Sequence, residues 1–125
     1  MTTAVRTKPP DRRRNWTQKV KMEGQKIYAC FGENADGRLV EVFLDASKQG
    51  TFVRGIMDAL ARVLSVSLQC GVPLIELVGA LRKLNFPPQG SVHGSAISEA
   101  SSVTDWLAQE IEQAYLAPKS EKKAG

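Results

Sequence analysis

The residues able to do chemistry are few and widely spaced. Two cysteines, Cys30 and Cys70, lie far apart, which fits neither a disulfide framework nor a CxxC metal site, so we expect buried free thiols. His93 is the only histidine, and a metal site there would need carboxylates from elsewhere, so we interpret it as a solvated loop residue. A serine nucleophile needs a positioned base, and the GxSxG pattern does not occur, so hydrolase chemistry is not favoured.

Two carboxylates, Glu41 and Asp45, fall on one face of an expected strand. They could share a cation, but polar residues on the solvent face of a half-exposed sheet explain them as well, and we favour that interpretation. The following loop combines Ser47, Lys48 and Gly50 ahead of the free backbone amides of a helix start, which is a candidate anion or partner contact. Helix capping by Ser47 or Asp45 is the alternative.

Positive charge is concentrated near the N-terminus. Between Arg6 and Lys26 there are eight Lys and Arg against two acids, a surplus larger than the net charge of +4 for the whole chain. A basic arm with Trp16 beside it can neutralise phosphates and stack on a base, or it can dock on an acidic protein surface, which we favour. The candidate contact residues of this arm are Arg12, Arg13, Arg14 and Lys19.

Turn residues separate alternating segments from later helical ones. We expect strands over 19–22, 25–31 and 39–45 and helices over 51–70, 73–84 and 97–116, with a loop from Phe86 to about Ser95. Apolar stripes mark the buried faces of the first and last helices. Their members are Val53, Ile56, Met57, Leu60, Val63, Leu64 and Leu68 in the first, and Val103, Trp106, Leu107, Ile111 and Ala114 or Tyr115 in the last.

This order predicts an α+β fold, in which a small antiparallel β-meander of two or three strands precedes three helices packed on one face. With 125 residues, 42% of them hydrophobic, the chain can bury one modest core. We expect a flexible basic arm over 1–15, one folded domain over 16–116 and a charged flexible tail over 117–125. No apolar run is long enough to span a bilayer and no signal peptide is evident, so we expect a cytoplasmic protein without membrane contact.

Several short motifs occur in a fixed order and give the chain a family resemblance. Together they resemble the TSCPD domain, the C-terminal domain of cobalamin-dependent ribonucleotide reductases, here as a free-standing small protein. The Thr-Ser-Cys-Pro-Asp string that names the domain is absent, so no metal or redox role of that string is carried over. The matching segments are Lys26 to Tyr28, Gly32 and Glu33, Asp36 to Arg38, Glu41 to Asp45, Lys48 to Gly50, Leu68 to Pro73, Phe86 to Gly90, and Ser102 to Trp106.

The resemblance implies a ribonucleotide-reductase-related accessory or regulatory protein in deoxyribonucleotide synthesis. The resembled enzymes need a radical cysteine, a reducing cysteine pair and groups that move substrate protons, which two isolated cysteines cannot supply. We therefore expect neither catalysis nor a cofactor in the isolated chain, although the full-length enzyme uses adenosylcobalamin. The expected partner is a ribonucleotide reductase catalytic chain or a nucleotide. The alternative function is a small nucleotide- or nucleic-acid-binding module that uses the basic arm, with nucleic acid the less favoured partner, and a homodimer is a third interpretation.

Overall fold

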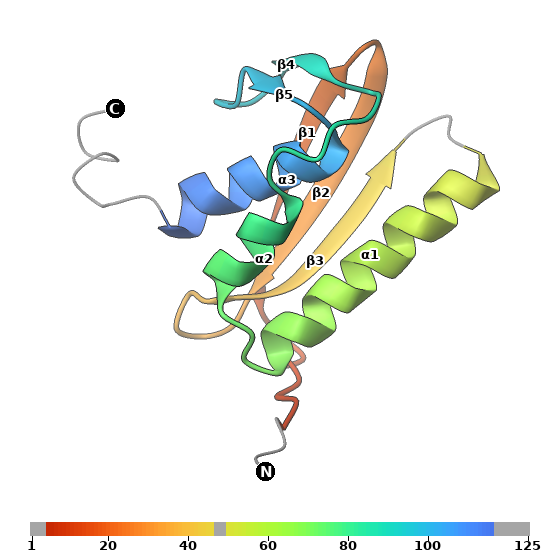
Figure 1. The fold of residues 1–125 in the computed structure, drawn as a ribbon. Coiled ribbons are helices and arrows are strands. Elements are labelled where there is room, and N and C mark those ends of the chain that lie inside the picture. The colour runs from red at the N-terminus through yellow and green to blue at the C-terminus, as the bar shows by residue number, and fades with distance from the viewer. Residues whose placement is uncertain (1–4, 47–49, 117–125) are drawn as a thin grey trace, which may run out of the picture.

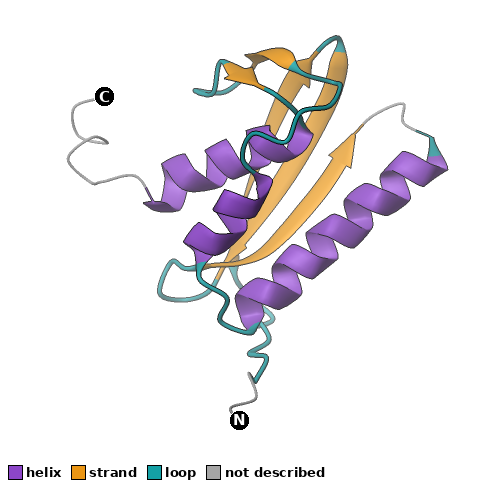
Figure 2. Ribbon diagram, in the orientation of Figure 1, coloured by secondary structure: helices purple, strands orange, loops and turns teal. Residues whose placement is uncertain are grey.

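The computed structural model describes residues 5–46 and 50–116. Figure 1 shows α2 and α3 in front of the sheet and α1 alongside β3, and Figure 2 shows the same arrangement by element type. The predicted α+β class is confirmed. The elements are β1 (Arg14–Met22), β2 (Gln25–Glu33), β3 (Leu39–Ala46), α1 (Thr51–Gln69), α2 (Leu74–Leu81), β4 (Gly90–His93), β5 (Glu99–Ala100), α3 (Val103–Ile111) and the π-helical turn η1 (Glu112–Leu116).

The first three strands form the predicted antiparallel meander. Glu23 and Gly24 connect β1 to β2 with φ of 50° and 78°, the paired positive φ values that match a hairpin turn to the twist of its strands. Gly37, with φ of 83°, serves the turn before β3. The first strand is longer than predicted, because it begins at Arg14 rather than Lys19. Arg14 and Asn15, which were predicted to lie in the flexible arm, are therefore strand residues.

The sheet has two strands that the sequence did not indicate. Its order is β3-β2-β1-β4-β5, and β4 joins β1 through the pairs Lys21 with His93 and Met22 with Val92. The segment predicted as a loop up to Ser95 is therefore partly strand, and His93 is a strand residue. The two strands have four and two residues, too few for an alternating pattern to be recognised in sequence.

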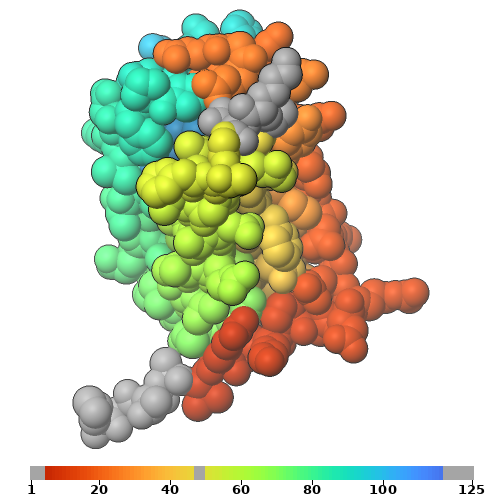
Figure 3. Space-filling view, turned by 90° about the vertical axis from the view of Figure 1, so that its right-hand side faces the viewer, coloured from red at the N-terminus to blue at the C-terminus, as the bar shows by residue number. Residues whose placement is uncertain are grey.

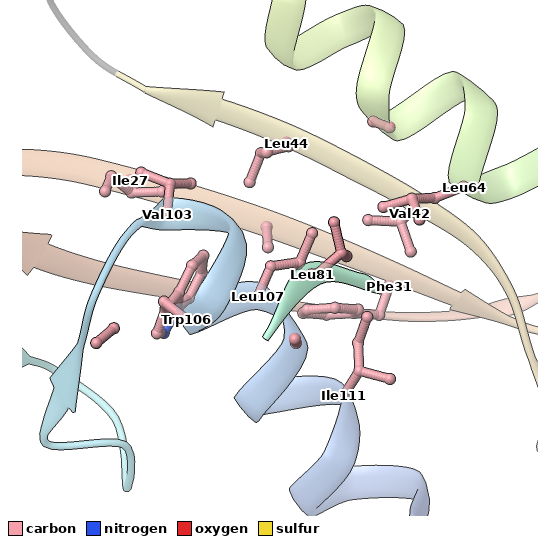
Figure 4. Packing of buried hydrophobic residues seen from close by; sticks show 14 of the residues in the cluster. Ile27, Phe31, Val42, Leu44, Leu64, Leu81, Val103, Trp106, Leu107 and Ile111 are labelled. Atoms are coloured by element: carbon pink, nitrogen blue, oxygen red, sulfur yellow. The ribbon is translucent and has the colours of Figure 1, made fainter. Parts of the chain in front are cut away.

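The core lies between the sheet and the helices. Trp106 and Leu107 of α3 have no exposed surface, and Figure 4 shows them packed among Ile27 and Phe31 of the sheet. The predicted stripe of the last helix is confirmed. The predicted start of this helix at Ile97 was wrong. Helix α3 begins at Val103, and the Ser102 hydroxyl caps it.

The first long helix covers the outer edge of β3. The Ser65 hydroxyl accepts a hydrogen bond from the backbone amide of Val42 at 2.8 Å and donates one to its carbonyl at 3.1 Å. The Gln69 side-chain amide donates to the carbonyl of Val40 at 3.0 Å. Backbone groups at a sheet edge otherwise offer a template for pairing with another chain. Helix α1 therefore closes this edge with side chains.

The buried stripe of α1 is narrower than predicted. Met57, Leu64 and Leu68 are buried as expected, but Ile56 is 56% exposed and Val63 is 62% exposed. Val53 is exposed as well. The prediction was wrong for these three residues because α1 packs on an edge strand, where contact from one side buries only part of a broad apolar arc.

Candidate functional site

The predicted anion contact lies largely outside the described residues, because Ser47 and Lys48 fall in the gap. Gly50 is the N-cap residue of α1 and provides no side-chain cap. Asp45, the alternative capping residue, instead forms an ion pair with Arg54 at 3.6 Å. The anion contact therefore stays a prediction.

The predicted basic arm does not form one patch. Arg13 pairs with Glu41 at 2.9 Å, which also accounts for one of the two carboxylates considered as a cation site. Lys19 lies on a different part of the sheet, with its ammonium group 5.2 Å from the centroid of the Tyr28 ring. Arg12 and Arg14 are exposed and border a small hollow beside the turn before β3. Their role in binding stays a prediction.

An apolar groove opens between α1 and the segment that follows α2. It encloses about 370 Å³ and is floored by Ile27 and Leu44. Phe52, 78% exposed, and Ile56 form one wall, and Phe86 forms part of the other. This groove was not predicted from the sequence. Its signal was the apolar arc of the first helix, which is wider than one buried stripe requires.

The Ser102 to Trp106 motif builds a structural junction. The Asp105 carboxylate is buried and accepts hydrogen bonds from the backbone amides of Lys83 at 2.7 Å and Ser101 at 3.0 Å. Arg82 and Gln109 also donate to it. Burial acts to raise the pKa of Asp105, but these four donors outweigh it and hold the pKa below the ordinary value of 3.8. A carboxylate saturated in this way is held ionised and is unsuited to proton transfer.

A second polar link joins the end of the chain to the sheet. The indole nitrogen of Trp16 donates to the Tyr115 hydroxyl at 2.9 Å, and that hydroxyl donates to Glu33 at 2.5 Å. Burial raises the pKa of Tyr115, and the hydrogen bond to Glu33 raises it further. The phenol is therefore held protonated and fastens η1 to β1 and β2.

The remaining chemical groups are isolated. Cys30 and Cys70 are free thiols, as expected, but are half-buried rather than buried. His93 is exposed. Within residues 5–46 and 50–116, no three His, Cys, Asp or Glu side chains gather in a way that could hold a metal ion, and no helix in those ranges has the length and apolarity needed to cross a membrane.

These features define a small α+β domain with an exposed apolar groove and, among the described residues, no cluster of side chains that could hold a metal ion. The TSCPD domain family matches residues 2–115, and the chain belongs to it. No solved structure gives a significant match.

Curated relatives are much longer than this chain. It is 42% identical over 112 residues to the vitamin B12-dependent ribonucleotide reductase of Agrobacterium fabrum, a match covering 89% of this chain and 9% of that protein. The proteins of the same name from Bradyrhizobium diazoefficiens and Rhodopirellula baltica are 41% and 36% identical, over 90% and 83% of this chain and 9% and 10% of theirs. The chain thus spans about a tenth of the length of the relatives it matches.

Proposed function

We propose that this chain is an accessory domain of vitamin B12-dependent ribonucleotide reduction, which docks on the catalytic part of the reductase and does not reduce ribonucleotides by itself. Its membership of the TSCPD family and its similarity to a small part of such reductases support this function. The single observation that carries it is the exposed apolar groove, on a domain that relatives hold within a much larger protein.

The groove has the character of a protein-docking surface. Phe52, Ile56 and Phe86 leave large apolar surfaces in contact with water around a hollow of about 370 Å³. Contiguous apolar patches of this kind mark sites of protein or ligand contact, since covering them is favourable. We assign the groove to an apolar segment of the reductase catalytic chain.

The chain's own groups support a role without independent catalysis. Cys30 lies on β2 and Cys70 follows α1, and neither is paired. The family resemblance implies adenosylcobalamin for the full-length enzyme. The apolar groove is too small to enclose a corrin ring with its adenosyl and nucleotide arms. In this proposal the cofactor and the radical chemistry belong to the catalytic chain.

The proposal can be tested with a related B12-dependent reductase that is truncated before its own TSCPD domain. Calorimetry measures whether this chain forms a complex with it. We expect binding that Phe52→Ala with Ile56→Ala weakens at least about tenfold, because truncation removes apolar area from the contact. Ile75→Ala is the matched control, since Ile75 is 65% exposed but does not line the groove.

Three results would contradict the proposal. One is the absence of a complex. Another is a dimer of this chain that the groove variants dissociate, which would assign the groove to a second copy. The third is formation of deoxyribonucleotide by the isolated chain when it is given adenosylcobalamin, a ribonucleotide and a dithiol.

A further inference from the structure

The sheet face turned away from the helical core is open and carries an unusual set of side chains. Strand residues alternate between two faces, and those opposite the core are exposed or half-buried. Figure 3 shows part of this region, with β3 in gold beside α1 in yellow-green. We call it the open face and define it by Thr17, Lys19, Lys21, Lys26, Tyr28, Cys30 and Phe43.

Two aromatic rings lie on adjacent strands of the open face. Phe43 of β3 is 52% exposed and pairs with Cys30, while Tyr28 of β2 is two residues further along. Side chains in this diagonal relation are about 7–8 Å apart and within reach of one ligand. An exposed aromatic ring offers a flat surface on which any nucleobase can stack, whatever its identity.

A hollow of about 380 Å³ lies at these rings, bordered by Thr17 of β1 and by Arg54 of α1. Its volume is within the range of about 300–1,000 Å³ that is typical of small-molecule sites. Tyr28 and Phe43 supply the aromatic lining. The strand residues that line the hollow belong mainly to the open face, whereas those of the apolar groove, such as Ile27, belong to the core face, and Leu44 borders both.

Three lysines of the open face, which do not line the hollow itself, favour an anion beside it. Lys21 and Lys26 are directly opposite each other on β1 and β2, an arrangement of like charges that destabilises a sheet unless an anion lies between them. Neither these two lysines nor Lys19 forms an ion pair with a described carboxylate. Glu41 is paired with Arg13 and Asp45 with Arg54, whereas Asp58 of α1 also lines the hollow and has no ion pair with a described residue.

We propose that the open face binds a nucleobase together with its phosphate. The base stacks on Phe43 in the hollow, beside Tyr28, whose ring is covered by the Lys19 ammonium at 5.2 Å, and the phosphate is held by Lys19, Lys21 and Lys26. The ligand is a free nucleotide or a segment of single-stranded nucleic acid, which present the same chemistry. This site is independent of the docking proposed for the groove, and its test requires no reductase.

The test measures fluorescence anisotropy of two probes with the whole chain, a fluorescent ATP analogue and a labelled single-stranded oligothymidylate, at low salt and at about 150 mM salt. We expect binding that Phe43→Ala weakens about tenfold and that Phe43→Trp retains, because tryptophan keeps an aromatic face. Lys21→Gln with Lys26→Gln should lower the slope of log K against log salt by about 0.7 for each lost phosphate contact. Val63→Ala, which alters an exposed apolar residue of α1, should leave binding unchanged.

Binding of the ATP probe would identify a free nucleotide, and binding of the oligothymidylate alone would identify a single strand. The proposal is overturned if neither probe binds at low salt. It is also overturned if Phe43→Ala binds as tightly as the wild type while circular dichroism shows both to be folded. If polyglutamate bound as tightly as the two probes, the open face would be a contact site for an acidic protein surface, and the proposal would be overturned as well.

Discussion

The carboxylate of Asp105 accepts a hydrogen bond from the backbone amide of Lys83 at 2.7 Å. This hydrogen bond joins the start of α3 to the residues that follow α2. Lys83 has φ of 66°, a left-handed conformation that is uncommon outside glycine and needs support from its surroundings. The same carboxylate holds the amide of Ser101 on the incoming strand connection. One side chain thus fixes three segments at a single point.

Asp105→Ala should destabilise the fold by about 3 kcal/mol, because it leaves two part-buried backbone amides without their acceptor and removes one of the two carboxylate partners of Arg82. Chemical unfolding monitored by tryptophan fluorescence measures the change. Asp58→Ala is the control, since Asp58 is exposed on α1, and it should lie within about 0.5 kcal/mol of the wild type. If the two variants were equally stable, Asp105 would not hold these segments together.

The same carboxylate predicts a dependence of stability on pH. Because the folded pKa of Asp105 is lowered, its contribution to stability is complete above the unfolded value of about 3.9 and is lost as the pH falls through the folded pKa. The free energy of unfolding of the wild type should therefore decrease between about pH 5 and pH 3 more than that of Asp105→Asn. Urea unfolding at each pH provides the measurement, and parallel curves would show that the carboxylate is not the source.

Trp106→Ala should cost about 3–5 kcal/mol and give poorly folded protein, because a fully buried ring is replaced by a cavity. The substitution also removes the buried hydrogen bond that the indole nitrogen of Trp106 donates to the Glu110 carboxylate at 2.9 Å. Ile75→Ala, at an exposed position, should unfold as the wild type does. An unchanged cooperative thermal transition in Trp106→Ala would mean that α3 does not pack on the sheet.

Ser65→Ala should destabilise the protein by about 1–3 kcal/mol, because both edge groups of Val42 lose their partner. Ser67→Ala in the same helix is the matched control, since it gives the same gain in helix propensity without touching β3. Hydrogen exchange at the Val42 amide should be faster in Ser65→Ala alone. Unchanged exchange would show that α1 does not close this edge.

Gly32→Ala should weaken the ion pair between Arg13 and Glu41. A Cβ at Gly32 would lie 2.9 Å from the Asn15 side-chain oxygen and 3.0 Å from a Glu41 carboxylate oxygen, so Glu41 must move. We expect a loss of about 1 kcal/mol that is less than additive with Arg13→Gln. Gly79→Ala has free space around its Cβ in α2 and should instead stabilise the helix by up to about 1 kcal/mol. If the stability losses of Gly32→Ala and Arg13→Gln were fully additive, Gly32 would not act through the ion pair.

Much of the fold could be predicted because its signals are local. Period-two alternation and the turn at Glu23 and Gly24 determine the meander, and the spacing of apolar residues determines the helices and the burial of Trp106. The order of the short motifs was sufficient to predict the TSCPD family. The predicted contacts at Ser47 and Lys48 stay predictions, because they lie outside the described residues.

The candidate sites depended on tertiary structure. The two-residue turn at Glu23 and Gly24 sets Lys21 opposite Lys26 locally, but the pairing of β2 with β3 decides that Phe43 lies beside Cys30 on the open face. The apolar arc of α1 is visible in sequence, but the packing of that helix on an edge strand decides that Ile56 is exposed and lines a groove. Strand β4 forms because the free edge of β1 is beside it. Periodicity along a chain specifies which residues share a face, whereas which faces meet is decided by contacts between segments that are far apart in sequence.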